Sequence, residues 1–246
     1  MEPSLNPPHK VSRSCELVVL FAAIVFPSFA TWLYFSWLGG HPSSRPAYAI
    51  SKLLQFTLPL VWLTWTNGQW PIQLVRPRPR DLLEGLAFGL AVTLGGLAIY
   101  YGFLRGGSLL GAAPRELTSK LSGFGIRTAG HFLALATFYS LAHSLLEEYY
   151  WRWFVFGGLR RYVPTAAAVA ISSLGFMAHH VLLIGHFLHG FGAATWLLSA
   201  AIAIGGAVWA WQYQRAGALY ASWLGHLVID AGLMWIGYDL WTAASH

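Results

Sequence analysis

Long apolar runs alternate with short polar segments along most of this chain. A membrane-spanning helix needs about 20 consecutive, mostly apolar residues. Seven segments have this character: residues 16–38, 47–66, 82–103, 130–156, 165–184, 192–213 and 217–238. Residues 106–129 are mixed, and we expect them to form a short interfacial or re-entrant helix, or an eighth span. The pattern predicts an all-α, polytopic membrane helical bundle of seven or eight transmembrane helices.

The same pattern suggests how the chain is divided. We expect a polar N-terminal tail over 1–15, N-terminal transmembrane helices over 16–129, a helical core over 130–238 and a short tail over 239–246. The segment 82–103 is rich in glycine, which allows two membrane helices to approach closely. Pro164 precedes the segment 165–184, at a position where a helix start tolerates proline.

The composition also indicates a membrane protein and argues against nucleic-acid binding. Hydrophobic residues make up 56% of the chain and charged residues only 10%, whereas soluble domains carry roughly 25% charged residues. The net charge of +6 comes from basic residues that lie mainly in loops, as the positive-inside rule expects, so we predict membrane lipid and no nucleic acid as a partner. Cys15 is the single cysteine and cannot form an intramolecular disulfide.

Loop charges predict the orientation of the bundle. In a seven-helix arrangement, the side of the N-terminus receives Lys10, Arg13, Arg76, Arg78, Arg80, Arg160, Arg161 and Arg215. The opposite side receives Arg45, Lys52, Arg105, Arg115, Lys120 and Arg127. This bias favours a cytoplasmic N-terminus, and we expect an integral protein of the plasma (inner) membrane of a prokaryote.

Two adjacent carboxylates and an arginine interrupt the apolar run 132–156. Ionisable groups at bilayer depth are costly and usually face a bundle interior or a wet cavity, so they indicate a functional site. Glu148 and Arg152 are four residues apart on one helix face and are expected to form an ion pair. Glu147 is rotated by about 100° from Glu148. It is therefore expected to face a different part of the bundle.

Two later segments supply polar partners at a similar depth. Counted along their helices, Glu147, His180, His226 and Asp230 lie about 14 to 24 Å from the same membrane face. Phe176 precedes His180 by one turn and is expected to pack within the bundle, with lining of a substrate cavity as the alternative. We expect the neighbouring His179 to point away from the immediate contacts of Glu147. His143, one turn before Glu147, ranks highest among the remaining histidines.

These residue types allow hydrolysis of a peptide bond. A carboxylate can take a proton from water, and histidines can orient that water or stabilise an oxyanion. One glutamate and two histidines are also a ligand set of zinc hydrolases, so a divalent metal such as zinc is an alternative. The chain has no compact ligand motif such as HExxH, and we therefore expect a site without a structural metal.

The three motifs together carry a family resemblance. Glu147-Glu148-x-x-x-Arg152, Phe176-x-x-x-His180 and His226-x-x-x-Asp230 occur in this order within hydrophobic segments. This pattern resembles the CPBP family, the CAAX-protease and bacteriocin-processing (Abi-type) intramembrane proteases, over about residues 130–238. The resemblance implies an endopeptidase acting on a membrane-associated or C-terminal-tail peptide or protein substrate.

The resemblance also implies roles for the motif residues. Glu147 would activate water, and His180 would help to position that water. Glu148 and Arg152 would shape the site and engage substrate, and His226 with the residue at 230 would stabilise the oxyanion. Prenyl-processing members often have asparagine at that last position. Asp230 departs from this pattern, because an ionised carboxylate cannot donate a hydrogen bond. It would have to be protonated, orient His226 or hold a metal.

Other function classes stay open at this stage. A non-catalytic membrane scaffold or immunity-type protein would keep the same fold. A haem carrier could use His143, His180 and His226 as axial ligands. A proton-coupled transporter is also conceivable, but such proteins usually contain inverted repeats, and the sequence shows no repeat.

Overall fold

In the computed structural model, the described part of the chain, residues 11–67, 76–111 and 113–243, is helical and contains no β-strand. The all-α prediction is therefore confirmed. Lys10 and most of the predicted N-terminal tail fall outside these residues. The helices follow the predicted apolar segments with ends that shift by a few residues, as is common at helix termini.

The N-terminal part forms a helical hairpin and a third long helix. The first helix comprises α1 (Arg13–Trp32) and continues as the π-helical stretch η1 (Leu33–Trp37). Helix α2 (Ser44–Asn67) returns beside it, and α3 (Pro79–Ile99) continues as the π-helical stretch η2 (Tyr100–Leu104). The predicted segment 106–129 contains a short 3₁₀ helix η3 (Ser108–Leu110) and α4 (Ala113–Gly123). Helix α4 has 11 residues and is about 16 Å long, too short to cross a bilayer core.

The C-terminal part begins with one uninterrupted helix over 129–159. It consists of α5 (Ala129–Thr137), the π-helical stretch η4 (Phe138–His143), α6 (Ser144–Glu148), the π-helical stretch η5 (Tyr149–Phe156) and α7 (Gly157–Leu159). Helices α8 (Thr165–Phe187), α9 (Ala193–Ala216) and α10 (Tyr220–Ala243) complete the bundle.

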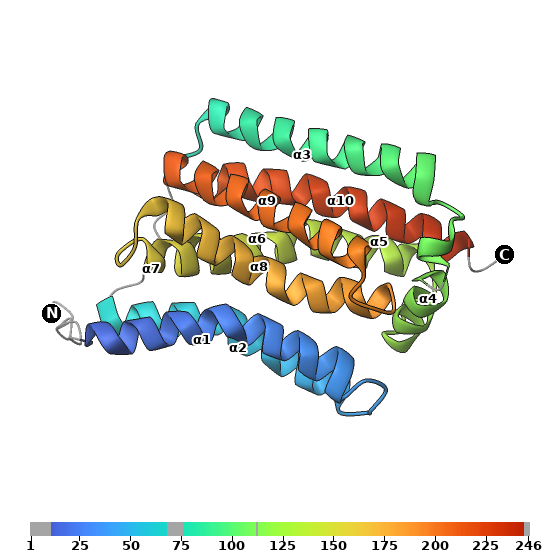
Figure 1. Ribbon diagram of the computed structural model, residues 1–246, viewed down its shortest axis with the longest axis horizontal. Helices are drawn as coiled ribbons and strands as arrows, with labels where there is room; N and C mark the ends of the chain where they lie inside the picture. The colour runs from blue at the N-terminus through green and yellow to red at the C-terminus, as the bar shows by residue number, and fades with distance from the viewer. Residues whose placement is uncertain (1–10, 68–75, 112, 244–246) are drawn as a thin grey trace, which may run out of the picture.

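Figure 1 shows these long helices running nearly along one direction, with α3 at one side of the bundle and α1 and α2 at the other. The helix 129–159 and α8, α9 and α10 lie between them. Helix α8 packs against α1 and α9, and α10 packs against α3 and α9. The central layer therefore holds all three sequence motifs.

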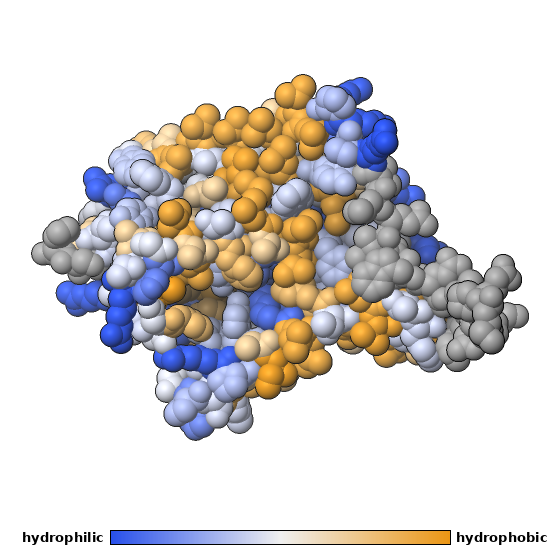
Figure 2. Space-filling model, turned by 180° about the vertical axis from the view of Figure 1, so that it is seen from behind, coloured by the Kyte–Doolittle hydropathy of each residue, from blue (hydrophilic) through white to orange (hydrophobic). Residues whose placement is uncertain are grey.

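Within the part of the chain that the structure describes, four helices are long and apolar enough to cross a membrane: Arg13–Trp37, Pro79–Leu104, Thr165–Phe187 and Ala193–Ala216. Many large apolar side chains, such as Phe21 and Phe103, are exposed on the surface. Figure 2 shows a broad hydrophobic band across one face, with hydrophilic residues concentrated towards its two ends. These features indicate an integral membrane protein, because a lipid-facing surface has no need to be polar. The count of seven spans stays a prediction.

Glycines bring α3 and α10 into close contact, as the glycine-rich segment predicted. A Cβ atom at Gly89 would lie 2.8 Å from the carbonyl oxygen of Gly225, and a Cβ at Gly225 would lie 3.0 Å from the carbonyl oxygen of Gly85. A side chain at these positions would force the two backbones apart. The contact matters for function because Gly225 directly precedes His226 on α10.

Candidate active site

The two carboxylates lie on a short α-helical segment between two π-helical stretches. Glu147 and Glu148 end α6, with η4 before them and η5 after them. The i→i+5 bonding of π-helices is rare and frequently occurs at functional sites. Both side chains are buried, with 4% of Glu147 and 0% of Glu148 exposed. Buried carboxylates need charged or hydrogen-bonding partners, and the two find different ones.

Glu148 is sealed by Arg152, which confirms the predicted ion pair. Arg152 donates from Nε to Oε2 at 3.1 Å and from Nη2 to Oε1 at 3.3 Å. Its guanidinium lies 4.9 Å from the ring centroid of Phe176 and 5.4 Å from that of Trp209. Arg152 is 0% exposed. In this conformation it supports the site through Glu148 and presents no surface to a substrate.

Phe176 packs within the site beside this ion pair. It is 1% exposed and packs between Arg152, Trp209 and His226. Its ring therefore supports the charged groups instead of lining a substrate cavity.

Glu147 faces three imidazoles that come from three helices. Its carboxylate oxygens lie 3.8 Å from Nε2 of His143, 3.9 Å from Nε2 of His179 and 3.7 Å from Nε2 of His226. The expectation that His179 points away from Glu147 was wrong. His179 stacks on Trp151, with ring centroids 5.8 Å apart and an interplanar angle of 5°, and this packing turns it towards the carboxylate.

His226 connects the two carboxylates. Its Nδ1 lies 2.9 Å from Oε1 of Glu148, and a carboxylate oxygen can only accept, so Nδ1 carries the proton of this hydrogen bond. Its ring stacks on Trp209 at a centroid distance of 4.2 Å and an angle of 15°. The sealed pair Glu148–Arg152 and the ring of Trp209 thereby fix the direction in which Nε2 points.

Asp230 lies one turn beyond His226 on α10. Its Oδ1 is 3.6 Å from Nε2 of His226, which is too long for a hydrogen bond. The side chain of Asp230 is 18% exposed, against 5% for His226. Asp230 therefore lies at the more open side of the cluster, near enough to His226 for electrostatic attraction.

His180 has a defined ring orientation. Its Nδ1 lies 2.9 Å from the carbonyl oxygen of Phe176, one turn earlier on α8. The carbonyl can only accept, so Nδ1 donates. In the neutral ring, Nε2 is then an unprotonated acceptor, which suits a group that orients water by accepting one of its hydrogens.

Metal-assisted hydrolysis stays a prediction. Within residues 11–67, 76–111 and 113–243, no group of three His, Cys, Asp or Glu side chains is arranged to hold a metal ion. If a metal were bound, Glu147 with His143, His179 and His226 would be the residues to hold it, because the Nε2 atom of each imidazole lies 3.7 to 3.9 Å from the carboxylate.

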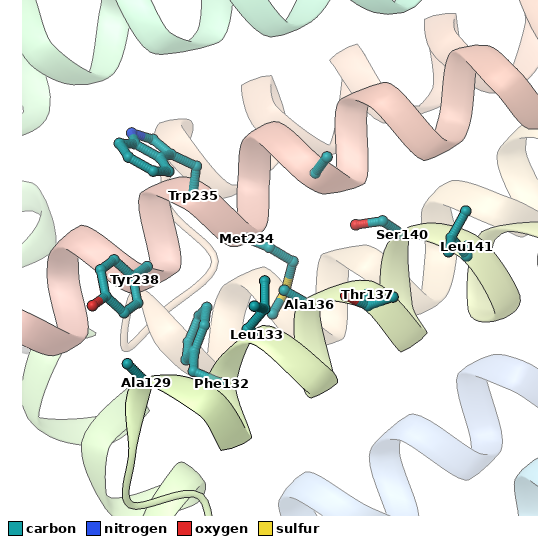
Figure 3. A pocket seen from close by; sticks show the side chains of 11 residues that line it. Ala129, Phe132, Leu133, Ala136, Thr137, Ser140, Leu141, Met234, Trp235 and Tyr238 are labelled. Carbon is teal, nitrogen blue, oxygen red and sulfur yellow. The ribbon is translucent and has the colours of Figure 1, made fainter.

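An apolar groove of about 530 Å³ runs beside the cluster, between α5–η4 and α10. Figure 3 shows Phe132 and Tyr238 towards one end and Ser140 and Leu141 towards the other. Ala231, the neighbour of Asp230, also lines it. The groove therefore passes the helix α10 next to the position of Asp230, and it does not contain the carboxylates themselves.

Lys52 is a charged residue near the site, and its predicted position among the loop charges was wrong. It was counted among the loop charges, but it lies inside α2, eight residues after Ser44, at a depth of about 12 Å along the helix. Its charge interacts electrostatically with that of Glu147. An intramembrane cation within a predicted span was the available signal, since such groups mark functional sites by default.

The comparison with protein families bears on this same part of the chain. Residues 129–232 match the model of a family described as Rce1-like, type II CAAX prenyl endopeptidase. No match was found among curated proteins or among solved structures. The matched segment contains all three motifs and begins and ends within a few residues of the span 130–238 that the motifs suggested. The match agrees with the resemblance to the CPBP family of CAAX-type proteases that the three motifs carry, and that resemblance is thereby confirmed.

Proposed function

We propose that this protein is an intramembrane endopeptidase that hydrolyses a peptide bond of a membrane-associated or C-terminal-tail substrate with water activated by Glu147. One observation carries the proposal. The Glu147 carboxylate is buried among three imidazoles, whereas its neighbour Glu148 is already neutralised by Arg152. Glu147 is therefore the carboxylate that has no guanidinium partner and is available for proton transfer.

The proposed reaction uses these groups in sequence. Glu147 takes one proton from a water molecule while the oxygen of that water attacks the carbonyl carbon of the peptide bond. His180 accepts the other hydrogen of the water at Nε2 and so orients the attack. When the tetrahedral intermediate collapses, the C–N bond breaks and Glu147 returns its proton to the leaving amine.

His226 is the proposed partner of the oxyanion. Its Nδ1 proton is committed to Glu148. A second proton on Nε2 would let the ring donate to the oxyanion at the same time. Asp230 would assist by its charge beside the ring, which favours the second proton on Nε2; it neither holds the ring nor donates a hydrogen bond. This arrangement needs no asparagine at that position.

The apolar groove supports a substrate with a hydrophobic portion. It is lined mainly by apolar side chains of α5, η4 and α10, and one of these residues, Ala231, directly follows Asp230. A hydrophobic segment of the substrate lying there would hold the peptide bond at membrane depth. Hydrophobic burial of this kind binds without chemical specificity.

The orientation with a cytoplasmic N-terminus is part of the proposal. Basic residues that were predicted to share one membrane side do cluster at one end of the bundle. Arg161 pairs with Glu16 near the start of α1, and Arg78 donates to the backbone oxygen of Arg215. In Figure 1, the start of α1 and the end of α10 lie at opposite ends of the bundle, as an odd number of crossings predicts.

Comparative analysis of C-terminal peptides in host cells tests the function. Cells carrying the wild-type protein are compared with cells carrying Glu147→Gln, with both proteins at equal membrane abundance. We expect new C-termini that are present with the wild type and absent with the variant. Identical C-terminal peptides in the two cell populations would contradict proteolysis and would favour a non-catalytic scaffold of the same fold.

A further inference from the structure

Lys52 is a residue of α2 and lies beside the site. Helix α2 is outside the segment 129–232 that matches the family model. Two routes of ring contacts connect Lys52 to Glu147 through His143. The Nζ of Lys52 lies 5.5 Å from the ring centroid of Phe56, which lies 6.1 Å from that of His143.

The second route passes through two tyrosines. The Nζ of Lys52 lies 5.8 Å from the ring centroid of Tyr48, and the hydroxyl of Tyr48 lies 3.5 Å from that of Tyr139. The ring of Tyr139 is 4.8 Å from that of His143, whose Nε2 faces Glu147. Lys52 is therefore separated from the carboxylate by two side chains along the first route and by three along the second.

Lys52 has no carboxylate partner among the described residues. Its Nζ donates to Oε1 of Gln55 at 3.3 Å and lies over the rings of Tyr48 and Phe56. Its electrostatic partner is Glu147, but the three imidazoles occupy the near positions around that carboxylate. An ammonium at bilayer depth without a close counter-ion is costly and needs an anion from elsewhere.

Gln55 provides a second, independent indication of a missing ligand. Its side chain is 2% exposed, and its Nε2 has no hydrogen-bond partner within the described part of the chain. Buried polar groups are nearly always hydrogen-bonded, and an unsatisfied one needs an explanation. Because Oε1 accepts from Lys52, the amide and the ammonium are held next to each other and together offer donors to one acceptor group.

We propose that Lys52 and Gln55 bind a carboxylate of the substrate peptide, its C-terminal carboxylate, and so place the peptide bond to be cut at Glu147. The proposal rests on the proposed proteolytic function and adds a substrate requirement to it. Arg152, the cation first expected to engage substrate, is sealed against Glu148 and 0% exposed, whereas Lys52 is only half-buried. A planar carboxylate fits this pair because it can accept from the ammonium and from the amide at the same time.

The test uses the full-length protein in lipid nanodiscs and a mixed library of short peptides with apolar C-terminal residues. The library is prepared as the free C-terminal acid, as the C-terminal amide, and as the amide with one internal glutamate. Cleavage by the wild type is followed by mass spectrometry. Binding is measured separately with the Glu147→Gln protein, with and without a second substitution at Lys52.

We expect the wild type to cut the free acids at least about tenfold faster than the amides, since a charge-assisted hydrogen bond is lost. Lys52→Met removes this preference by lowering the rate for acids to that for amides, Lys52→Arg keeps much of it, and Gln55→Leu weakens it. Lys120→Met is the matched control, because Lys120 lies over Tyr34 and Phe35, and it keeps the full preference.

Every other outcome contradicts the carboxylate site, its assignment to the C-terminus, or proteolysis. If Lys52→Met slows acids and amides equally, Lys52 acts only through the site's charge or stability, and the carboxylate proposal fails. If the glutamate-containing amides match the free acids, the carboxylate comes from a side chain and the C-terminal assignment fails. If no peptide is cut but acid-selective binding depends on Lys52, the carboxylate site stands and proteolysis fails.

Discussion

Glu147 and Glu148 are adjacent in sequence but lie in two different environments. Behind the helix, Glu148 is closed in by Arg152, Trp209 and Phe176, with two hydrogen bonds from one guanidinium. In front, Glu147 meets three histidines at 3.7 to 3.9 Å and no arginine. A rotation of about 100° between neighbours on a helix is enough to separate the two.

The difference shows how one helix can hold a structural charge and a reactive charge side by side. The sealed pair satisfies its own electrostatics and positions His226 through Nδ1. The front carboxylate is left with partners that can exchange protons. Substitutions at the Glu148–Arg152 pair should therefore act mainly on stability, and substitutions at Glu147 should act mainly on catalysis.

The largest effect is expected from Arg152→Met. Removing one partner of a buried ion pair leaves the other charge uncompensated and typically costs about 3–5 kcal/mol. Glu147→Gln should change the free energy of unfolding by less than about 1 kcal/mol while abolishing cleavage. Thermal denaturation of both variants in one detergent measures the contrast.

The double variant Glu148→Gln with Arg152→Met is the control for this prediction. It removes both charges, so it should recover part of the stability that Arg152→Met alone loses. Should Arg152→Met prove as stable as the wild type, the sealed pair would not be the structural element described here.

A smaller effect is expected from Gly85→Ala, which acts on the placement of His226 from outside the site. A Cβ at Gly85 would collide with the backbone of Ala221 on α10, and α10 would have to move. A displacement of about 1 Å at a reacting group can cost about a hundredfold in rate. Gly95→Ala on the same helix has no atom within 4 Å of the added Cβ and should keep full activity in the same cleavage assay. Equal rates for the two variants would contradict the role of the close helix contact.

The smallest effect is expected from Asp230→Asn. Since Nε2 of His226 lies 3.6 Å from Asp230, the ring is held by Glu148 and Trp209 instead, and an amide could itself donate to an oxyanion. We expect a rate loss below about tenfold. Asp239→Asn, which changes the same residue type where it pairs with Arg105 far from the cluster, controls for the loss of a charge on α10. A loss of more than about a hundredfold for Asp230→Asn alone would make Asp230 a direct participant in the chemistry.

Much of the fold could be predicted from the sequence because each long helix coincides with an apolar run. The glycines of the segment 82–103 predicted a close helix contact, but they could not name α10 as the partner. Partner choice depends on which backbones face each other, as Gly89 and Gly225 do, and this is a property of the assembled bundle.

The site was less predictable where helix geometry departs from the α-helical period. The pair Glu148–Arg152 followed from a spacing of four residues. The orientation of His179 did not, because it is decided by stacking on Trp151, a residue of the π-helical stretch η5. Lys52 was assigned to topology because counting charges does not show which of them face the interior.

The π-helical stretches η4 and η5, which flank the glutamates, also affect how this chain aligns with its relatives. A π-helical turn accommodates one residue more than an α-helical turn, so η4 and η5 behave like short insertions that were absorbed without breaking the helix. Relatives with a regular α-helix here are expected to be shorter at these positions. Alignments of the family should therefore place gaps within 138–143 and 149–156, and homology of the glutamates should be judged on the intervening segment.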